Sequence, residues 1–554
     1  RDAMSRTWDS QINKVKPKNR SNTLYMKVIL LGTLLLMTNH LFSQQVNPNP
    51  WVMKADTTLE MTYRNPVLPG FYSDPSVCRV GEDYYLVTST FEYFPGVPVF
   101  HSKDLINWEQ IGHVIHRKEQ IPKDLNIFAP TLRYHKGIFY MITTNVSTRG
   151  NFYMTATDPS GPWSDPTWIN VSGIDPDIFF DDDGRVYIAN SNFELVEIDI
   201  ATGKLIGESR KIWNSTGGRY PEAPHIYKKD GFYYLMAAEG GTEEAHSVTL
   251  ARSHSIWGPY INNPNNPIVT HVNVAGMGKP IQGLGHADMI LAHDDNWWMV
   301  LHGYRSVTGY PPHHILGRET CLVPVHWPKG SWPVVNGNGT VNEEMYHPTL
   351  PQQPFDSETS RISFTEDLGL DWNYIQPFDK RNFELDTKEG QLILKGSALE
   401  IGEKGNPTFI GRRIKDIKFS STTRLEFDPV HENEEAGLIL QNNDTHFDIL
   451  IASKGGERYV VVKLQFGQTI YRSEEFVLSP GPVDLKIEGK GEEFVFSFAQ
   501  NGTDFTVVEK ADVRFLSTET VGWFTGIYIG LYATGTGKES EAYAKFDWFE
   551  YISQ

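Results

Sequence analysis

The sequence predicts an all-β protein with two large domains, a five-bladed β-propeller followed by a β-sandwich. Three observations lead to this fold class. A chain of 554 residues is longer than one hydrophobic core usually supports. Five aromatic strand patterns recur at a period near 50 residues between residues 62 and 350. From about residue 360 the pattern changes to short alternating strands separated by Gly, Asn and Asp turns.

The first feature along the chain is an apolar run. Met26-Lys27 is followed by VILLGTLLLMTNHLFSQQ, a basic start, an apolar stretch and small or polar residues. This pattern predicts a signal peptide over residues 26–43, and the run is too short to span a membrane. No Cys follows to accept a lipid, so we expect an exported bacterial protein, periplasmic or extracellular. Residues 1–25 carry no usable pattern and stay unassigned.

Residues 62–350 contain the repeat that predicts the propeller. Each copy is a polar turn followed by an aromatic, β-rich strand. The copies read GEDYYLVTST, KGIFYMITTN, DGRVYIANSN, DGFYYLMAAE and DDNWWMVLHG. Their anchoring aromatics are Tyr85, Tyr140, Tyr187, Tyr234 and Trp298. We therefore expect five blades and no long helices in this region.

The strand before each aromatic carries a residue at an equivalent position. Twelve residues earlier lie Phe128, Asp175, Glu222 and His286, and Asp74 lies eleven before Tyr85. Equivalent positions on the innermost strands of a propeller surround one channel, so these five side chains are expected to meet there. Asp74 and Asp175 each precede a proline, which predicts extended backbone at both. Any one carboxylate could equally well cap a turn, but the shared repeat position favours a common site.

Carboxylates facing one another across a neutral substrate are the machinery of glycoside hydrolysis. A third carboxylate nearby can raise the pKa of the acid by repulsion. The net charge of −18 opposes a nucleic-acid partner. Two cysteines, Cys78 and Cys321, form no disulfide framework. The sequence has no GxSxG elbow, HExxH pair or phosphate-binding loop that would indicate another type of active site. The DDDG segment at 181–184 fits a hairpin turn better than a calcium loop.

Several ordered motifs resemble glycoside hydrolase family 43, most closely its β-xylosidase and α-L-arabinofuranosidase branch. The motifs are NPVLPGFYSDPSV, STFEYFPGVPVFHSKDLINW, FAPTLRYHKGIFY, IDPDIFFDDDGRVY, RYPEAPHIYKKDGFYYL, GLGHADM and LGRETCLVPVHW. The resemblance implies an exo-acting, inverting enzyme. It would release xylose or arabinose from xylan, arabinoxylan or arabinan fragments, with acid and base carboxyls roughly 6.5–9.5 Å apart.

The resemblance also implies roles for residues. Asp74 matches the general base, Glu222 the general acid and Asp175 the carboxylate that tunes and orients the acid. Arg318 matches an arginine that binds the sugar in the innermost subsite. His286 matches a central histidine that contacts a metal ion or water in the channel.

Two aromatic residues complete the implied sugar pocket. Phe91 matches an aromatic wall, and Phe128 stands where relatives commonly have Trp. No cofactor is implied as a requirement, and a structural calcium in the channel is left open.

Several of these residues could instead have a purely structural role. Arg318 could pair with its neighbour Glu319, His286 could be a packed core residue, and Phe91 and Phe128 could be core aromatics. At the level of function, the alternatives are an endo-arabinanase and a non-catalytic carbohydrate-binding propeller.

The second half begins after a Pro-rich linker at 351–359. Residues 360–554 contain QLILKG, EAGLILQN, RYVVVKLQF and IYIGLYATG, which predict an antiparallel sandwich. TFIGRRIKDIKFSSTTRLEF and AKFDWFEYIS are similar to the concanavalin- or jelly-roll-like sandwich of the same branch. In that branch a sandwich loop closes one side of the pocket, which favours exo attack. Sequence does not identify the loop here, and a purely structural sandwich is an equal expectation.

Overall fold

The computed structural model describes residues 62–122, 124–274, 279–309, 311–346, 350–355, 359–378 and 380–554. Residues 1–25 and the predicted signal peptide at 26–43 lie outside the described residues, as do residues 356–358 of the predicted linker. Everything from Met61 onward belongs to one unit. In the part of the chain that is described, no helix has the length and apolar character to cross a membrane.

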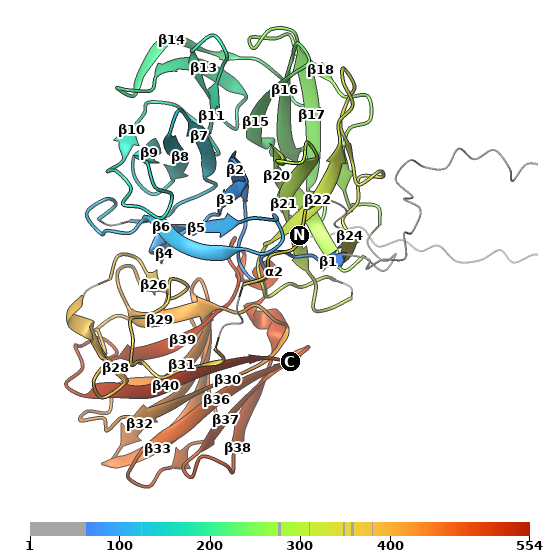
Figure 1. The fold of residues 1–554 in the computed structure, drawn as a ribbon. Helices are drawn as coiled ribbons and strands as arrows, with labels where there is room; N and C mark the ends of the chain where they lie inside the picture. The colour runs from blue at the N-terminus through green and yellow to red at the C-terminus, as the bar shows by residue number, and fades with distance from the viewer. Residues whose placement is uncertain are drawn as a thin grey trace, which may run out of the picture. The chain divides into compact units, whose positions relative to one another are not determined.

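Within the described residues, five antiparallel sheets follow one another as propeller blades (Figure 1). Blade I is β2 (Ser76–Val80), β3 (Asp83–Val87), β5 (Gly96–Ser102) and β6 (Glu109–Ile115). Blade II is β7 (Thr131–His135), β8 (Ile138–Asn145), β9 (Gly150–Ala156) and β10 (Thr167–Trp168). Blade III is β11 (Asp177–Phe180), β12 (Val186–Ala189), β13 (Glu194–Asp199) and β14 (Lys204–Lys211).

The last two blades are larger. Blade IV is β15 (Glu222–Lys229), β16 (Phe232–Glu239) and β17 (Ser247–Ser253), with β18 (Ile261–Asn262) and β19 (Val269–Thr270) both beside β17. Blade V is β20 (Ile281–Leu291), β21 (Trp297–Arg305), β22 (Glu319–His326) and β23 (Val334–Val335). The prediction of five blades is confirmed.

The anchoring aromatics lie where the repeat places them, on the second strand of every blade. Tyr187, Tyr234 and Trp298 are at most 1% exposed. Burying rings of this size supplies much of the apolar area that holds neighbouring blades together. The DDDG segment forms the turn between β11 and β12, with Gly184 at φ +87°, so the hairpin interpretation is correct.

The ends of the propeller region attach to blade V. Strand β1 (Thr62–Arg64) pairs with β24 (Glu344–Tyr346). Asn65 donates from Nδ2 to the carbonyl of Leu322 on β22 at 3.0 Å and accepts from the Leu322 N–H at 2.8 Å. Both ends of the region are therefore held next to blade V, beside the junction with blade I.

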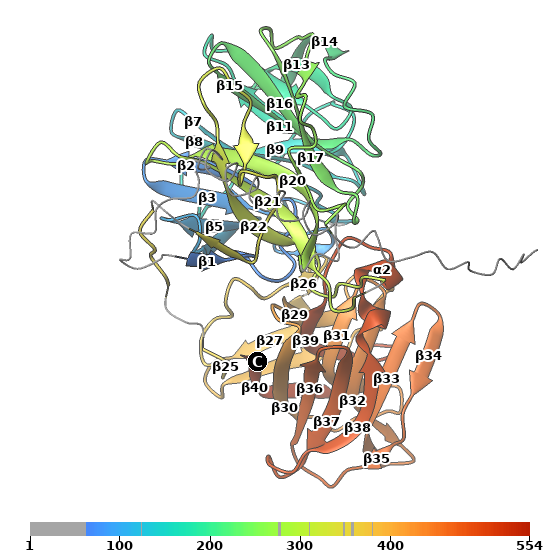
Figure 2. The same cartoon turned by 90° about the vertical axis from the view of Figure 1, so that its right-hand side faces the viewer.

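The second half of the chain is a sandwich of two antiparallel sheets (Figure 2). One sheet runs β27 (Phe383–Asp386), β28 (Gln391–Lys395), β40 (Tyr543–Ser553), β30 (Lys418–Glu426), β36 (Val483–Lys490), β37 (Glu493–Ala499) and β38 (Thr506–Asp512), with β25 (Arg361–Ile362) beside β40. The other runs β29 (Thr408–Arg413), β39 (Tyr528–Thr534), β31 (Glu435–Asn442), β32 (Thr445–Lys454), β33 (Glu457–Phe466) and β34 (Thr469–Arg472), with β35 (Phe476–Val477) beside β33. Short helices η1 (Lys380–Asn382), η2 (Val513–Leu516) and α2 (Thr518–Val521) connect strands.

Alternation along β31 shows how the sandwich is filled. Leu438 and Leu440 enter the core between the two sheets. Ile439 points to the opposite face and packs in a cluster that contains Phe91 and Tyr93 of the propeller. The second face of this sheet is therefore a contact surface for blade I.

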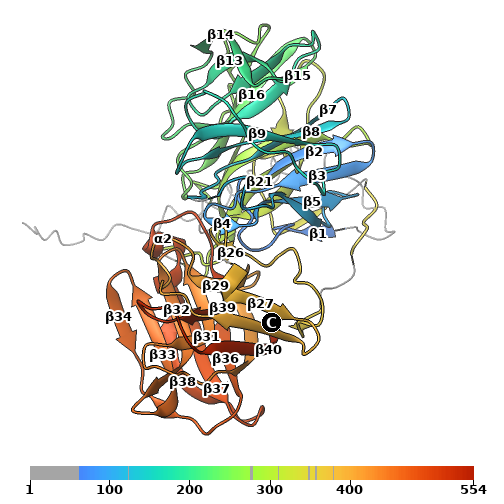
Figure 3. The same ribbon diagram turned by 90° about the vertical axis from the view of Figure 1, so that its left-hand side faces the viewer.

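A small sheet joins the two halves. Strand β26 (Tyr374–Ile375), at the start of the sandwich, pairs with β4 (Tyr93–Phe94) in the loop between β3 and β5 of blade I (Figure 3). The β4 segment begins two residues after Phe91, a predicted pocket residue. The backbone hydrogen bonds of this pair therefore connect the sandwich to the loop that carries Phe91.

Candidate active site

The predicted ring lies at the beginning of the innermost strands. Asp74 and Asp175 each stand two residues before a first strand, Glu222 opens β15, and His286 lies within β20. Nδ1 of His286 is 3.4 Å from Oδ1 of Asp74. The N–H of Ala223, next to Glu222, donates to Oδ2 of Asp175 at 3.2 Å. Neighbouring blades thus bring the three carboxyl-bearing segments and His286 to one end of the channel.

The backbone at these positions differs from the prediction. Asp74 has φ +56° and Asp175 φ +51°, so the expected extended conformation is wrong. Ala223 at +53° and His286 at +47° share the left-handed conformation. A following proline disfavours the right-handed helical region but leaves this one open. Strained backbone of this kind occurs where surrounding structure holds a functional side chain in place.

Asp74 is only 4% exposed and its carboxylate is fully bonded. Oδ1 accepts from Nη1 of Arg318 at 2.8 Å, and Oδ2 accepts from the hydroxyls of Ser89 at 2.5 Å and Ser73 at 2.9 Å. Burial by itself would raise the pKa of Asp74, but Arg318 and the adjacent histidines outweigh it and hold that pKa well below its ordinary value. Asp74 is therefore ionised across the neutral range.

The histidines beside Asp74 are neutral near pH 7. Burial lowers the pKa of His286 to about 4, although the Asp74 and Glu222 carboxylates oppose the change. Burial and then Arg318 hold the pKa of His302 well below its ordinary value. Arg318 is therefore the one full positive charge, among these groups, that stabilises the Asp74 carboxylate at neutral pH.

Asp175 has the opposite electrostatic environment. Burial, followed by repulsion from Glu222 and Asp74, raises the pKa of Asp175 well above its ordinary value. The repulsion expected between the paired carboxyls is thus visible on Asp175. The Glu222 side chain is 21% exposed, which leaves it open to a ligand in the pocket, and its Oε1 lies 3.4 Å from Nε2 of His246.

Arg318 follows Gly317, which has φ +73°, and directly precedes β22. Besides Asp74 it donates to Oγ1 of Thr242 at 3.1 Å and to the carbonyl of Phe524 at 3.4 Å. Glu319 instead binds Nε and Nη2 of Arg305, each at 2.8 Å. The alternative of a surface pair between Arg318 and Glu319 is therefore wrong.

A loop of the sandwich reaches this site. It follows α2 and carries Trp523 and Phe524. The Phe524 ring stacks on Phe91 at 5.8 Å and meets Phe128 edge-on at 5.9 Å. The indole N–H of Trp523 donates to Oε2 of Glu92 at 3.2 Å. Sequence reasoning expected such a loop without finding it, and an aromatic pair bracketed by Gly522 and Gly526 was the available signal.

The aromatic cluster has buried and accessible members. Phe91 is 2% exposed, so other rings cover nearly all of it. Phe128, Trp523 and Phe524 are half-buried. The apolar surface open to a sugar is therefore supplied mainly by Phe128 and the sandwich loop, with Phe91 behind them.

Deeper in the channel, Arg133 fills the space between blades. It contacts Asp177 at 2.8 Å, Asp288 at 2.7 Å and Nδ1 of His225 at 2.9 Å. Asp288 also accepts from the hydroxyls of Ser76 and Tyr227 at 2.7 and 2.6 Å. These residues come from the innermost strands of all five blades and form an ion-paired, hydrogen-bonded layer beneath the site.

This layer bears on the calcium left open by the resemblance. Calcium takes six to eight oxygen ligands. The Asp177 and Asp288 carboxylates share the single guanidinium of Arg133, and His286 faces Asp74. Among the described residues, no group of three or more His, Cys, Asp or Glu side chains is arranged to hold a metal. These described residues thus form no preformed calcium cage, and the expected contact of His286 with a metal ion or water stays a prediction.

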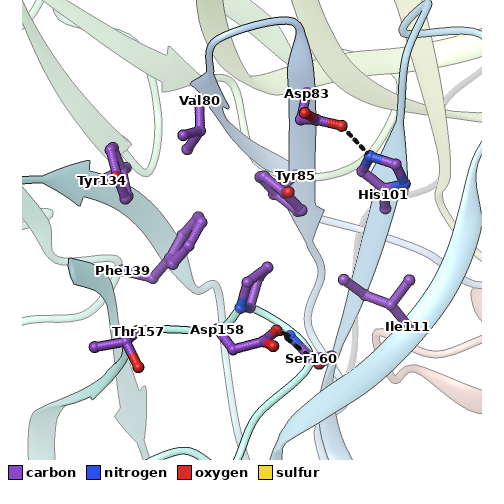
Figure 4. Close-up of a pocket in the computed structure, with 11 residues that line it drawn as sticks. Val80, Asp83, Tyr85, His101, Ile111, Tyr134, Phe139, Thr157, Asp158 and Ser160 are labelled. Atoms are coloured by element: carbon purple, nitrogen blue, oxygen red, sulfur yellow. Dashed lines mark hydrogen bonds and ion pairs between the residues drawn. The ribbon is translucent and has the colours of Figure 1, made fainter. Parts of the chain in front are cut away.

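A groove of about 550 Å³ opens between blades I and II (Figure 4). Tyr85, Tyr134 and Phe139 line it, together with Asp83, which binds His101 at 2.6 Å. It begins beside Val80, at the opposite end of β2 from Asp74. The groove contains none of the predicted site residues and is separate from the carboxylate cluster.

Both halves of the chain match known protein families. Residues 63–333 match Glycosyl hydrolases family 43, and residues 361–552 match the Beta xylosidase C-terminal Concanavalin A-like domain. The chain belongs to glycoside hydrolase family 43. It is a glycoside hydrolase, and its propeller region and its sandwich each match a known domain family.

Family 43 relatives cover nearly the whole chain. A non-reducing end α-L-arabinofuranosidase from Bacteroides ovatus is 40% identical over 507 residues, which are 89% of this chain and 95% of that protein. A xylosidase/arabinosidase from Butyrivibrio fibrisolvens is 40% identical over 88% of this chain and 98% of its own. A β-xylosidase from Bacillus subtilis is 31% identical over 89% of this chain and 99% of its own.

Solved structures of family 43 proteins agree with the architecture. The Bacteroides ovatus xyloglucan PUL protein GH43B superposes with a TM-score of 0.85 at 40% identity, covering 89% of this chain and all of its own. The xylan β-1,4-xylosidase of Bacillus halodurans superposes with a TM-score of 0.84 at 32% identity over the same shares. The all-β prediction of a propeller followed by a sandwich is confirmed.

Proposed function

We propose that this family 43 enzyme is an exo-acting, inverting glycosidase that removes xylose or arabinose from xylan-type hemicellulose or its oligosaccharides. One observation carries the proposal. An ionised, buried Asp74 and a partly accessible Glu222 lie at a channel mouth where the sandwich loop contributes Phe524. The names of the xylosidase and arabinofuranosidase relatives support the two candidate sugars.

The proposed chemistry is a single displacement. Asp74 takes a proton from a water molecule while the water oxygen bonds to the anomeric carbon. The glycosidic C–O bond breaks at the same time, and Glu222 gives its proton to the departing oxygen. Asp74 ends protonated and Glu222 ionised. The water needs space between the two groups, so a carboxyl separation of roughly 6.5–9.5 Å stays a prediction.

The remaining site residues have supporting roles. Arg318 keeps Asp74 ionised and offers N–H donors to the sugar hydroxyls in the innermost subsite. Asp175, with its raised pKa, orients the segment that carries Glu222 through the Ala223 N–H. His286 contributes a neutral imidazole beside Asp74. None of these roles requires a metal, and we propose that hydrolysis proceeds without one.

The sandwich loop supports the exo mode of attack. An endo-acting enzyme needs a cleft that is open on both sides of the cleaved bond. Here Trp523 and Phe524 lie against Glu92, Phe91 and Phe128 on one side of the site. We propose that this contact leaves room for the end of a sugar chain, and that an arabinan chain does not pass through the site.

We also propose that the enzyme is exported. The support is the apolar run after Met26-Lys27, typical of a signal peptide. Expression of the chain in a bacterium with an intact export pathway, followed by N-terminal sequencing, tests this. A mature N-terminus near residue 43 is expected, whereas an intact residue 26–43 segment in the purified protein would contradict export.

The function is tested with 4-nitrophenyl β-D-xylopyranoside, 4-nitrophenyl α-L-arabinofuranoside and xylobiose. Wild type is expected to cleave at least one aryl glycoside, and the relative rates identify the sugar. Proton NMR of the product first released from xylobiose should show α-xylose. Glu222→Ala should abolish xylobiose cleavage, while the nitrophenyl substrates lose less because their leaving group needs little protonation. Initial release of β-xylose would contradict inversion.

A further inference from the structure

Two buried histidines lie between the proposed base and the proposed acid. His302 lies on β21, and His246 directly precedes β17. Both side chains are 0% exposed. Nε2 of His302 is 3.2 Å from Nδ1 of His246, and Nε2 of His246 is 3.4 Å from Oε1 of Glu222. The two rings thus form a continuous path from Asp74 to Glu222.

His302 contacts both the backbone and the carboxylate of Asp74. The Asp74 N–H lies 3.1 Å from Nδ1 of His302, and Oδ1 of the Asp74 carboxylate is 3.1 Å from the same nitrogen. Burial holds the pKa of His302 well below its ordinary value, so the ring is neutral near pH 7. With Nδ1 held at Asp74, the other ring nitrogen, Nε2, faces His246.

His302 in turn helps to hold His246. Nε2 of His302 and the carbonyl oxygen of Gly283 lie 3.2 and 3.3 Å from Nδ1 of His246. These two contacts fix the orientation of the ring, so that its second nitrogen, Nε2, faces Glu222.

The His246 ring is held in place by Gly285 on β20. A Cβ at Gly285 would lie 2.3 to 2.4 Å from three atoms of the ring, which is closer than side chains approach one another. Nε2 of His246 is buried and has no hydrogen-bond partner among the described residues. Its nearest acidic atom is Oε1 of Glu222, at a distance that a small rotation shortens to a hydrogen bond. Catalytic hydrogen bonds are often long before substrate binds.

We propose that His246 is a positioning residue for the general acid, oriented through His302 by the general base. Its Nε2 pairs with Oε1 of Glu222 and so leaves Oε2 for the proton that passes to the leaving group. This inference rests on the proposed function, since it assigns Glu222 the role of acid. It makes the placement of the acid depend on the same residue that activates water.

The experiment compares leaving groups. His246→Ala and Gly285→Ala are assayed on xylobiose, or the matching arabino-disaccharide, and on the preferred 4-nitrophenyl glycoside. Misplacing an acid slows departure of a poor leaving group most. We expect kcat on the disaccharide to fall by about 30- to 100-fold and kcat on the nitrophenyl glycoside by less than about 3-fold. Gly285→Ala keeps the imidazole and only displaces it, so it should give the same signature.

Two further variants serve as matched controls. His246→Gln keeps an N–H donor near the position of Nε2 and should recover part of the disaccharide rate. Gly309→Ala places a Cβ where nothing lies within 4 Å and should match wild type. Thermal unfolding of each variant is recorded in parallel. A variant that fails to fold is excluded, and the remaining variants test the proposal.

The outcomes separate the two proposals. Equal losses on both substrates in His246→Ala and Gly285→Ala, with no recovery in His246→Gln, would mean a structural role and would overturn the inference. A wild type that cleaves neither substrate would overturn the proposed function itself. A wild type that is active on both, with selective losses in the two variants, supports both proposals.

Discussion

Arg318 and Asp74, which are 244 positions apart in the sequence, form a buried ion pair in which Nη1 donates to Oδ1 at 2.8 Å. The pair joins the connection between β21 and β22 of blade V to the start of blade I. A buried charge is costly without a partner, so each residue depends on the other. The guanidinium thus makes an ionised carboxylate compatible with a position that is only 4% exposed.

Replacing Arg318 should move the acid limb of the pH profile. In wild type the pKa of Asp74 is well below 3.8, so kcat/KM should stay on its plateau down to about pH 4. In Arg318→Met, burial is no longer outweighed and raises the pKa of Asp74. The limb should move upward by roughly one to three pH units, with a lower plateau because a sugar contact is lost. Arg305→Met, which removes a guanidinium that pairs with Glu319, is the control and should leave the limb in place. A limb that does not move in Arg318→Met contradicts the pairing.

Truncating Phe524 should weaken substrate binding. Phe524→Ala removes a half-buried ring that stacks on Phe91 and bounds the pocket. We expect a rise in KM of roughly 10-fold with a smaller change in kcat, because the ring contacts the sugar without taking part in proton transfer. Steady-state kinetics on the preferred aryl glycoside measure this. Phe515→Ala, on the exposed side of the sandwich at 48% exposure, should behave as wild type. An unchanged KM in Phe524→Ala would show that the loop does not bound the pocket.

Removing Arg133 should destabilise the fold. Arg133→Met leaves Asp177 and Asp288 buried without their common cation. Breaking a buried pair in this way costs about 3–5 kcal/mol, so Tm should fall clearly. Arg149→Met, at an exposed position over Trp168, should leave Tm nearly unchanged. Treatment of wild type with EDTA, followed by dialysis, should alter neither Tm nor kcat. A loss of stability that calcium restores would show that a metal occupies the channel after all.

Glu92 should make stability depend on pH. Burial raises the pKa of Glu92 from 4.5 to about 7, although the Trp523 N–H opposes the shift. The folded state therefore holds this proton more tightly than the unfolded state, and the associated stability is lost as pH rises from 4.5 through 7. Glu92→Gln removes the titrating group. The difference in Tm between pH 5 and pH 8 should be smaller in the variant than in wild type. Parallel pH dependences of Tm in the two proteins would exclude this assignment.

The repeat made the propeller predictable from sequence. An aromatic strand recurs in every blade because each blade must pack a large ring against its neighbour. Residues such as Tyr187, Tyr234 and Trp298 therefore recur in the sequence at a regular spacing. The same period brought Asp74, Asp175, Glu222 and His286 into one group. Packing constraints that repeat along a chain leave a signal that a single sequence can carry.

The features of the site that the sequence did not predict depend on contacts that do not repeat from blade to blade. The left-handed backbone at Asp74 and Asp175 is imposed by the surrounding fold and overrides the local preference before proline. The Trp523–Phe524 loop lies outside the repeat, and the other blades do not have histidine at the positions that correspond to His246 and His302. Their role is visible only once distant segments are placed in space.

The pairing of β26 with β4 and the placement of Phe524 beside Phe91 have a consequence for biosynthesis. The ribosome synthesises the whole propeller sequence, with Asp74 and Glu222, well before it reaches residue 524. A chain that ends before this point has both carboxylates but lacks the side of the site that Trp523 and Phe524 supply. We therefore expect full activity only after translation has passed Phe524 and the sandwich has docked.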